Sequence, residues 1–509
     1  MSFMYRVREY ANRTIERIGA YPVLQAFGAG LLMGSVFVHP FFWWAGIAGL
    51  LLLLWVLERR TSAKQAFWIL VIAGVTKSLL AYLWLFSIYP LDWIGDLSVE
   101  SQLVAITWMW IVSGFSVGVS YGVLGVCMYL IKGLGRRSYL YFPVLLVLTE
   151  MLGALLFSLA QAGPGSGINI YTTFGHIGYA LAQHGLLGHL AKFGGVYSLI
   201  FISALIALFF FVHTKRLKRT NWSDRTLQVR CCIGLLLFFG TFGINVPITT
   251  LPVGYSVATI NTEFGNMHEA SKEVKADRVR AILDAFTVAL GSDVDSIVFP
   301  ETAYALNVFG KQENIFAFIR SNTNRDVLVI DSDGAVVESG EPVVRAVVYD
   351  SKTLQRTVAY KQYLVPGGEY VPYHLNFLMS FFGFDDTSSA YLNKQFAFTP
   401  GEKTEFMYDR VPGILFCSEI VSPFHTRIAA KSAGIPIIIH PISHGWFHTP
   451  TMFWHQMSLI HKTQVRSVGV PLVQVANLWE SRAYDAFGNP IQGETIYETA
   501  STSVVVYEL

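Results

Sequence analysis

The stretch GILFCSEI spans residues 413–420. It contains an apolar run of strand character that ends at Cys417, and a serine and a glutamate follow. Cys417 is the only cysteine in the second half of the chain. Two other polar residues stand beside strand-like runs. Glu301 closes a run that ends in Phe-Pro-Glu, and Lys361 opens the stretch KQYLVPGGEYVP, residues 361–372. Glu, Lys and Cys in this order predict covalent acyl-transfer chemistry at a thiol.

The composition places part of the chain in lipid. Of its 509 residues, 53% are hydrophobic and 14% are charged, and the mean hydropathy is +0.44. A typical soluble protein has about 25% charged residues. Three of the four cysteines, Cys127, Cys231 and Cys232, lie in apolar runs, so the sequence predicts no disulfide framework.

Residues 1–250 are predicted to form a transmembrane helical domain. Seven apolar runs in this part are of roughly the length, about 17–25 residues, that crosses a bilayer. They lie near residues 21–39, 41–57, 66–89, 103–131, 139–160, 193–213 and 229–248. Lys77 and Glu150 fall inside these runs. Because a lone charge in lipid is costly, they are functional candidates, and we expect them to pair between helices.

The loops between the runs indicate the orientation. Basic residues cluster before the first run and after the second, fourth and sixth, whereas Asp92, Asp96 and Glu100 follow the third. Basic loops favour the cytoplasmic side of a membrane. An odd number of runs then carries residues 251–509 to the other side, which we expect to be the periplasmic face of a bacterial inner membrane.

From residue 251 the hydropathy pattern changes to short apolar runs separated by polar segments. Strand-like runs lie at residues 256–262, 296–300, 326–331, 343–350, 413–417, 436–440, 471–476 and 503–508. Helical periodicity is clearest at 268–290, and a second helix is expected near 451–467. Strands interleaved with helices predict an α/β domain of layered helices and sheets over residues 251–509.

The three polar residues have complementary chemistry. A thiol is a modest nucleophile near neutral pH until a base takes its proton or a cation stabilises the thiolate. Glu301, beside a proline and an apolar strand, is the candidate base, because desolvation raises a carboxyl pKa. Lys361 offers positive charge to the thiolate and to the oxyanion of a tetrahedral intermediate. The backbone N–H of Ser418 is a candidate second oxyanion donor.

At these residues, and in the stretch from Lys361 to Glu369 combined with the membrane half, the sequence resembles the apolipoprotein N-acyltransferase family. This family is a membrane-bound branch of the nitrilase, or carbon–nitrogen hydrolase, superfamily. The resemblance implies an αββα sandwich after the membrane helices. It also implies transfer of a fatty acyl group from a phospholipid, through a thioester on Cys417, to the N-terminal amine of a lipoprotein. Glu301 would be the base and Lys361 the oxyanion partner.

The same resemblance implies several further site residues. Glu369 would be a supporting acid and Glu419 the acid just after the nucleophile. The segment at residues 444–447 looks like the family segment that ends in Trp-Phe, so Trp446 and Phe447 would line the substrate site. The resemblance implies no cofactor and no nucleic-acid partner. His444 and His448 lack a third ligand at a suitable spacing, so we expect no metal.

Four places depart from the family pattern. Ser418 stands where an aromatic residue is usual and Gly367 where phenylalanine is usual. Residues 443–445 read Ser-His-Gly instead of Asn-Asp-Ala, and the turn expected near Asn477 is changed. These departures fit a divergent branch, similar to the conjugal-transfer TraB proteins. They leave open a membrane-anchored amidase that uses water as acceptor, and a non-catalytic conjugation or envelope-assembly factor that keeps the fold.

The predicted orientation can be tested with a reporter fused after Leu509. We expect a reporter that is active only in the periplasm to work at this position, because the basic loops fall on the opposite side. Activity of a strictly cytoplasmic reporter at the same position would reverse the orientation.

Overall fold

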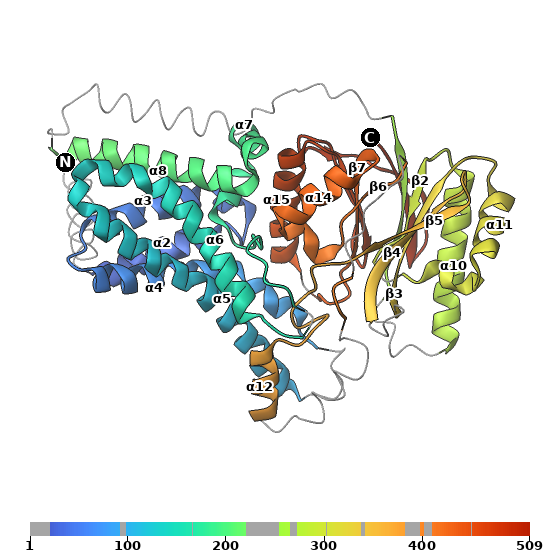
Figure 1. Cartoon of the computed structure of the whole chain (residues 1–509), viewed down its shortest axis with the longest axis horizontal. Coiled ribbons are helices and arrows are strands. Elements are labelled where there is room, and N and C mark those ends of the chain that lie inside the picture. Colours follow the sequence, from blue (N-terminus) through green and yellow to red (C-terminus); the bar gives the residue numbers. More distant parts are fainter. Residues whose placement is uncertain are drawn as a thin grey trace, which may run out of the picture.

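A computed structural model describes residues 21–91, 98–164, 166–219, 254–264, 272–301, 303–336, 342–381, 398–401, 410–448 and 450–509. A bundle of helices forms one half of the molecule, and a sheet covered by helices forms the other (Figure 1). The seventh predicted run, at 229–248, and the expected domain boundary near residue 250 lie outside the described residues.

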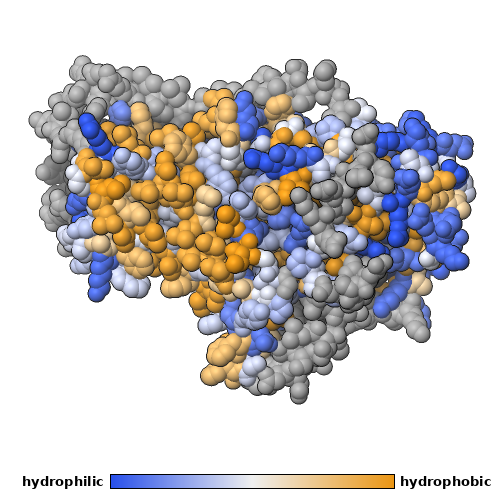
Figure 2. All heavy atoms as spheres, viewed as in Figure 1, coloured by the Kyte–Doolittle hydropathy of each residue, from blue (hydrophilic) through white to orange (hydrophobic). Residues whose placement is uncertain are grey.

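The helical half contains five stretches that are long and apolar enough to cross a membrane, and they match the second to sixth predicted runs. They are Pro40–Glu58, Ala63–Ile88, Val99–Gly135, Arg137–Ala160 and Gly195–Lys215. Their main helices are α3 (Ala45–Glu58), α4 (Ala63–Ala81), α5 (Val99–Leu130), α6 (Phe142–Ala160) and α8 (Gly195–Arg219). Figure 2 shows hydrophobic residues gathered over this half. The chain is therefore a multi-pass membrane protein.

The first predicted run differs from the expectation. It forms α2 (Pro22–Ser35), whose 14 residues are fewer than the roughly 20 that a spanning helix needs. Pro40, which lacks a backbone N–H and sits well at a helix start, instead begins the next helical stretch. The run at 21–39 is thus a helix shorter than a span.

Glycines bring α4 and α5 into close contact. A Cβ added at Gly118 would collide with the backbone of Val75, and one added at Gly74 would collide with the carbonyl of Gly118. Small residues at helix interfaces allow such an approach within a membrane, where packing is a main source of association. These positions set the spacing of the two helices.

The expected pairing of Lys77 and Glu150 is confirmed. Lys77 Nζ on α4 lies 2.7 Å from Glu150 Oε1 on α6, and Tyr121 on α5 donates to the same oxygen at 2.8 Å. Both charged side chains are fully buried. Because an unpaired charge inside the bundle would be costly, this contact ties three helices together.

The second half is built on a sheet of twelve strands. They are β1 (Ser256–Thr262), β2 (Ser296–Val298), β3 (Leu328–Val336), β4 (Pro342–Asp350), β5 (Gln355–Tyr360), β6 (Pro412–Ile414), β7 (Ile435–Ser443), β8 (Leu472–Asn477), β9 (Arg482–Tyr484), β10 (Pro490–Ile491), β11 (Glu494–Glu498) and β12 (Thr502–Glu508). β1 to β3 run parallel, as do β6 to β8, and β12 pairs antiparallel with β1. Each strand-like run of the sequence overlaps one of these strands.

Alternating side chains divide this half into four layers. On β1, Ile260 packs outward against α10 (Lys272–Gly291) and α11 (Gln312–Asn322), whereas Val257 packs inward. On β7, Ile439 joins the inner core with Val257, whereas Ile438 packs outward with α14 (Pro423–Ser432) and α15 (Thr451–Val468). Two sheet faces therefore pack on each other between two helical layers, which confirms the αββα sandwich.

The sandwich and the bundle are in direct contact, with α14 and α15 on the side of the sandwich that faces the bundle (Figure 1). Hydrogen bonds between the halves join Thr173 to Val421, Gln161 to Tyr370, Ala81 to Gln456 and Ala182 to Arg466. Three of these partners come from the segment between α6 and α8, which also carries α7 (Gly185–Gly188). This segment therefore provides much of the bundle's hydrogen-bonded contact with the sandwich.

One further helix, α12 (Tyr373–Phe381), lies beside α5 and away from the sheet (Figure 1). Leu375 and Met379 pack against Met109 of α5. Tyr373, Phe377 and Phe381 on the other face are 61%, 69% and 73% exposed. The helix is therefore buried on one face only. The apolar stretch continues in the sequence to Phe382, which lies outside the described residues.

Candidate active site

Three strand ends bring the predicted site residues together. Glu301 follows β2, Lys361 follows β5 in the same sheet, and Cys417 follows β6 across the sandwich. Because each residue lies within three residues of the end of its strand, the position of its backbone is set by the sheet and not by a long loop. The two faces of the sandwich therefore meet at these three side chains.

Lys361 is the centre of the group. Its side chain is fully buried, and its Nζ donates to Glu301 Oε1 at 2.9 Å and to Glu369 Oε1 at 2.6 Å. Burial alone lowers the pKa of Lys361, but the two carboxylates outweigh burial and raise the pKa well above its ordinary value. The ammonium therefore stays charged at any physiological pH.

Glu301 and Cys417 share a hydrogen bond between carboxyl and thiol. Burial raises the pKa of Glu301, and Lys361 only partly offsets this increase. Burial and the nearby Glu301 charge raise the pKa of the Cys417 thiol well above its ordinary value. The resting Cys417 side chain is thus a neutral thiol beside a carboxyl group that could accept its proton.

Glu369 accepts hydrogen bonds both from Lys361 and from the backbone of the turn that precedes it. Its second carboxylate oxygen, Oε2, accepts from the Val365 N–H at 2.8 Å. Between these residues Gly367 has a φ of 79°, a left-handed conformation that a residue with a Cβ rarely adopts. This tight turn accounts for glycine at the position where the family pattern has phenylalanine.

Glu419 braces the nucleophile turn against the lysine segment. Its Oε1 accepts from the Gln362 N–H at 2.7 Å, and its Oε2 accepts from the Phe416 N–H at 3.0 Å. Both oxygens are therefore engaged by backbone on either side of the site. This geometry links the Cys417 turn to the segment that follows Lys361.

Cys417 itself has an unusual backbone. It begins a short 3-10 turn, Cys417–Val421, and its φ is 21°, which is positive for a residue other than glycine. Such conformations are costly and persist where surrounding contacts enforce them, often at functional sites. The turn lifts the side chain out of the sheet and leaves it partly exposed to a cavity.

That cavity has a volume of about 150 Å³, and both halves of the molecule form its walls. From the helical half come Trp84, Leu85, Ile88, Leu91, Ala105, Ile106, Met109 and Phe174. From the sandwich come Val365, Pro366, Gly367, Gly368, Leu375, Cys417, Ser418, Val421, Ile442, His444, Trp446, Phe447, Phe453 and Met457. Trp446 and Phe447, which the resemblance assigned to the substrate site, line the same cavity as Cys417.

The helical side of the cavity was not predicted. Trp84, Met109 and Phe174 sit in ordinary apolar segments, and only the tertiary packing brings them to Cys417. The partly buried Ser418 lines the same cavity, but its hydroxyl donates to the Tyr363 carbonyl at 2.7 Å. The wall around the thiol is therefore mainly apolar.

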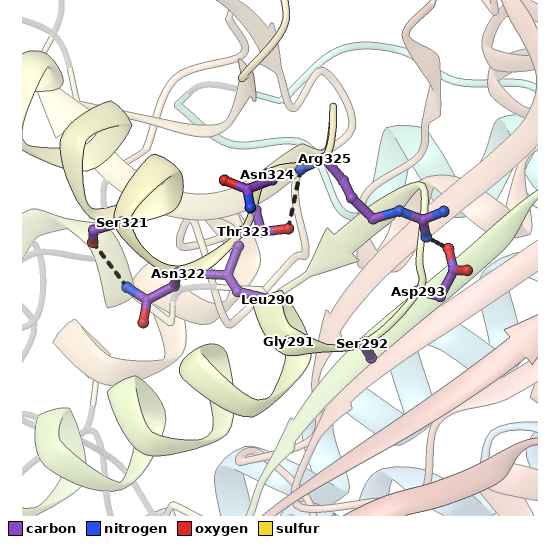
Figure 3. Close-up of a pocket in the computed structure, with 9 residues that line it drawn as sticks. All are labelled: Leu290, Gly291, Ser292, Asp293, Ser321, Asn322, Thr323, Asn324 and Arg325. Carbon is purple, nitrogen blue, oxygen red and sulfur yellow. Dashed lines mark hydrogen bonds and ion pairs between the residues drawn. The ribbon is translucent and has the colours of Figure 1, made fainter.

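A second hollow, in Figure 3, lies where α10 and α11 end. It is lined by residues 290–293 and 321–325 and is mostly polar. Arg325 forms an ion pair there with Asp293. None of the predicted site residues lines it, and among the described residues no cluster of three metal-ligating side chains is found.

Comparison with known proteins identifies the helical half. Residues 29–209 match the family model for the apolipoprotein N-acyltransferase N-terminal domain. This match confirms the resemblance drawn from the sequence. No protein with a curated function matches the chain.

Solved structures similar to the second half are carbon–nitrogen hydrolases and amidases. A carbon–nitrogen hydrolase from Helicobacter pylori G27 has 13% identity and a TM-score of 0.36, and the match covers 50% of this chain and 89% of that one. An amidase from Nesterenkonia sp. has 13% identity and a TM-score of 0.33, with 52% and 92% covered. A mutant of the Nesterenkonia sp. AN1 amidase carries the acetamide moiety of fluoroacetamide on its active-site cysteine. It has 13% identity and a TM-score of 0.33, with 50% and 90% covered.

The raised pKa of Glu301 predicts a pH dependence. We expect acylation of Cys417 to decline as the pH falls through that pKa, because a protonated Glu301 cannot accept the thiol proton. Glu301→Gln should slow acylation by about two to four orders of magnitude, with partial recovery at alkaline pH where the thiolate forms unaided. Single-turnover acylation by a short activated ester, followed across a pH series, measures both effects.

Two variants complete this experiment. Lys361→Ala should recover less at alkaline pH, because the oxyanion then lacks its cation at every pH. Glu313→Gln, an exposed carboxyl on α11, is the matched control and should leave the profile unchanged. Superimposable profiles for Glu301→Gln and Lys361→Ala would contradict separate roles for the two residues.

Proposed function

We propose that this protein is a membrane acyltransferase. It takes a fatty acyl group from a phospholipid onto Cys417 as a thioester and passes the group to an amine, the N-terminal amine of a lipoprotein. The observation that carries the proposal is the cavity. The Cys417 thiol, hydrogen-bonded to a buried carboxyl, opens into an apolar space whose other wall is made of membrane helices.

Acylation uses the three site residues in turn. Glu301 takes the thiol proton as Cys417 Sγ attacks the ester carbonyl carbon of the phospholipid. The oxyanion that forms is balanced by Lys361 and by the backbone N–H of Ser418. The intermediate then collapses, the C–O bond breaks, and the proton on Glu301 moves to the departing lysophospholipid oxygen. A thioester remains on Cys417, and Glu301 is again ionised.

The second half-reaction repeats these steps with an amine. The neutral amine attacks the thioester carbon, Glu301 accepts a proton from the attacking nitrogen, and the C–S bond breaks. The proton returns to Cys417 as the amide leaves. Glu301 therefore alternates between base and acid, and Lys361 keeps its charge throughout because Glu369 and Glu301 hold its pKa high.

The apolar wall favours a lipid donor over a small soluble amide. An acyl chain entering beside Trp84 and Met109 would exchange bilayer for protein without exposure to water. The basic loops of the sequence support placing the sandwich on the periplasmic side of the inner membrane, where lipoproteins and the outer leaflet are both reachable. Intact Glu301, Lys361 and Cys417 argue against a non-catalytic factor that merely keeps the fold.

Intact-mass analysis of the purified protein with diacyl phospholipid tests the proposal. We expect an increase in mass by one acyl group, located on Cys417, and its loss when a peptide with a free N-terminal cysteine is added. Cys417→Ala should show no adduct, and Cys127→Ala, which removes the other described free cysteine, should behave as wild type.

Two outcomes would redirect the proposal. No adduct on wild-type protein, with Cys417 intact, would contradict acyl transfer from phospholipid. An adduct that water removes as fast with the peptide as without it would favour the membrane-anchored amidase, with water as acceptor.

The exposed aromatic face of α12 gives a separate prediction. Phe377 and Phe381 stack on each other at a helical spacing, beside the entrance formed by α5 and the Glu369 turn. Phe377→Ser combined with Phe381→Ser should weaken acylation by a long-chain phospholipid and spare a short, water-soluble ester, because the lost contact is with lipid.

Ile496→Ser, on an exposed strand of the sandwich, is the matched control for loss of a surface apolar residue. Equal losses on both substrates would make this face part of the packing around the site. In that case the lipid would have to reach Cys417 by another side of the cavity.

A further inference from the structure

A pair of buried histidines lies beside the backbone of Cys417. His440, on β7, is fully buried, and its Nε2 is 3.0 Å from the carbonyl oxygen of Cys417. Its Nδ1 is 3.1 Å from Nε2 of His461 on α15. Nothing in the sequence pattern assigns a role to these histidines, and the mechanism above does not use them.

The contact with Cys417 requires a particular tautomer of His440. A carbonyl oxygen can only accept, so this hydrogen bond needs the hydrogen on His440 Nε2. The bare Nδ1 then accepts from His461 Nε2–H. Burial lowers the pKa of His440 to about 4, so the ring is neutral at physiological pH and has a single N–H to offer.

The surroundings of the pair hold it in this orientation. His461 stacks on Tyr484 at 5.6 Å with an angle of 12° between the rings, and it also has a hydrogen bond with the Met457 backbone. The positive charge of Lys361 adds to the lowering of the His440 pKa. Arg482 acts in the same direction on the pKa of His444 and of His461. Two neutral rings carry two N–H protons for three contacts. The Cys417 and Met457 carbonyls therefore compete for these protons, and the Cys417 contact is a hydrogen bond in the tautomer that places the hydrogen on His440 Nε2.

The Cys417 carbonyl matters because of what is at the other end of its peptide. A trans peptide is planar, so its C=O and N–H point in opposite directions. The carbonyl of Cys417 and the N–H of Ser418 belong to the same peptide. Among the described residues, none accepts a hydrogen bond from that N–H, and Ser418 lines the cavity that contains the thiol.

We infer that His440, oriented by His461, is a positioning residue for the oxyanion hole. By holding the Cys417 carbonyl, it aims the Ser418 N–H into the cavity, where the oxyanion of the acyl intermediate forms. The hydrogen bond also polarises the peptide and strengthens the N–H as a donor. The positive φ of Cys417 makes such an anchor necessary, because this conformation is not favoured by the residue itself. The inference rests on the proposed acyl transfer at Cys417.

The test compares two reactions of the same thiol. Acylation by a short activated ester passes through an oxyanion, whereas alkylation by iodoacetamide needs a reactive thiol but no oxyanion hole. We expect His440→Leu to slow acylation by about tenfold or more, somewhat less than the loss of an oxyanion donor itself. Alkylation should stay within about twofold of wild type, because it depends on the thiol and its base alone.

Conservative variants separate positioning from packing. His440→Gln keeps an N–H that can reach the carbonyl and should recover part of the acylation rate. His461→Phe keeps a ring against Tyr484 but cannot donate, so it should slow acylation and spare alkylation. His455→Leu, on the same helix with its Nε2 2.9 Å from the Val36 carbonyl, is the matched control and should change neither reaction.

Parallel losses of acylation and alkylation in His440→Leu and His461→Phe would overturn the inference in favour of a packing role. Unchanged acylation in both variants would overturn it as well. The activated ester keeps this test apart from the proposed function: wild-type protein that reacts with the ester and not with phospholipid would contradict the lipid donor alone. Melting temperatures of the variants show whether slow acylation comes from partial unfolding.

Discussion

The buried ammonium of Lys361 between two carboxylates is the contact on which the rest of the site depends. A charge taken out of water must be paired, and removing one partner of a buried pair typically costs about 3–5 kcal/mol. Here Glu301 and Glu369 lie within 2.9 Å and 2.6 Å of one nitrogen. The fold must therefore bring together the end of β2, the end of β5 and the turn before α12. Once they meet there, Cys417 has a base within reach and a cation nearby.

The site lies where the apolar helical bundle meets the sandwich. The sandwich alone would place the thiol beside a polar group of residues, and the bundle alone would offer only an apolar wall. Contacts such as the Tyr370 hydroxyl on the Gln161 carbonyl, at 2.9 Å, hold the two together. Polar chemistry on one side and an apolar approach on the other are what a reaction between a lipid ester and a thiol requires.

Local pattern was enough to predict much of the fold and part of the site. The run at 256–262 coincides with β1, because strand-forming residues between polar segments leave few alternatives. Glu301, Lys361 and Cys417 were identifiable because each follows a strand, and the ends of strands converge in a sandwich. α2 was overestimated as a span because hydropathy continues past Ser35 while the helix does not. The cavity wall at Trp84 and the anchor at His440 were not predictable, because only tertiary contacts give these residues a role.

Charge conservation makes both proposed half-reactions compatible with so buried a site. With Glu301 and Glu369 ionised and Lys361 protonated, the three groups sum to one negative charge. Moving the thiol proton to Glu301 transfers that charge to sulfur and then to the oxyanion, but its total does not change. Each of these positions lies near Lys361, so no step creates a new charge in an apolar environment. An incoming ammonium would break this balance by adding a positive charge to the cavity. The acceptor must therefore lose its proton before it reaches the thioester, at the edge of the cavity where water is still present.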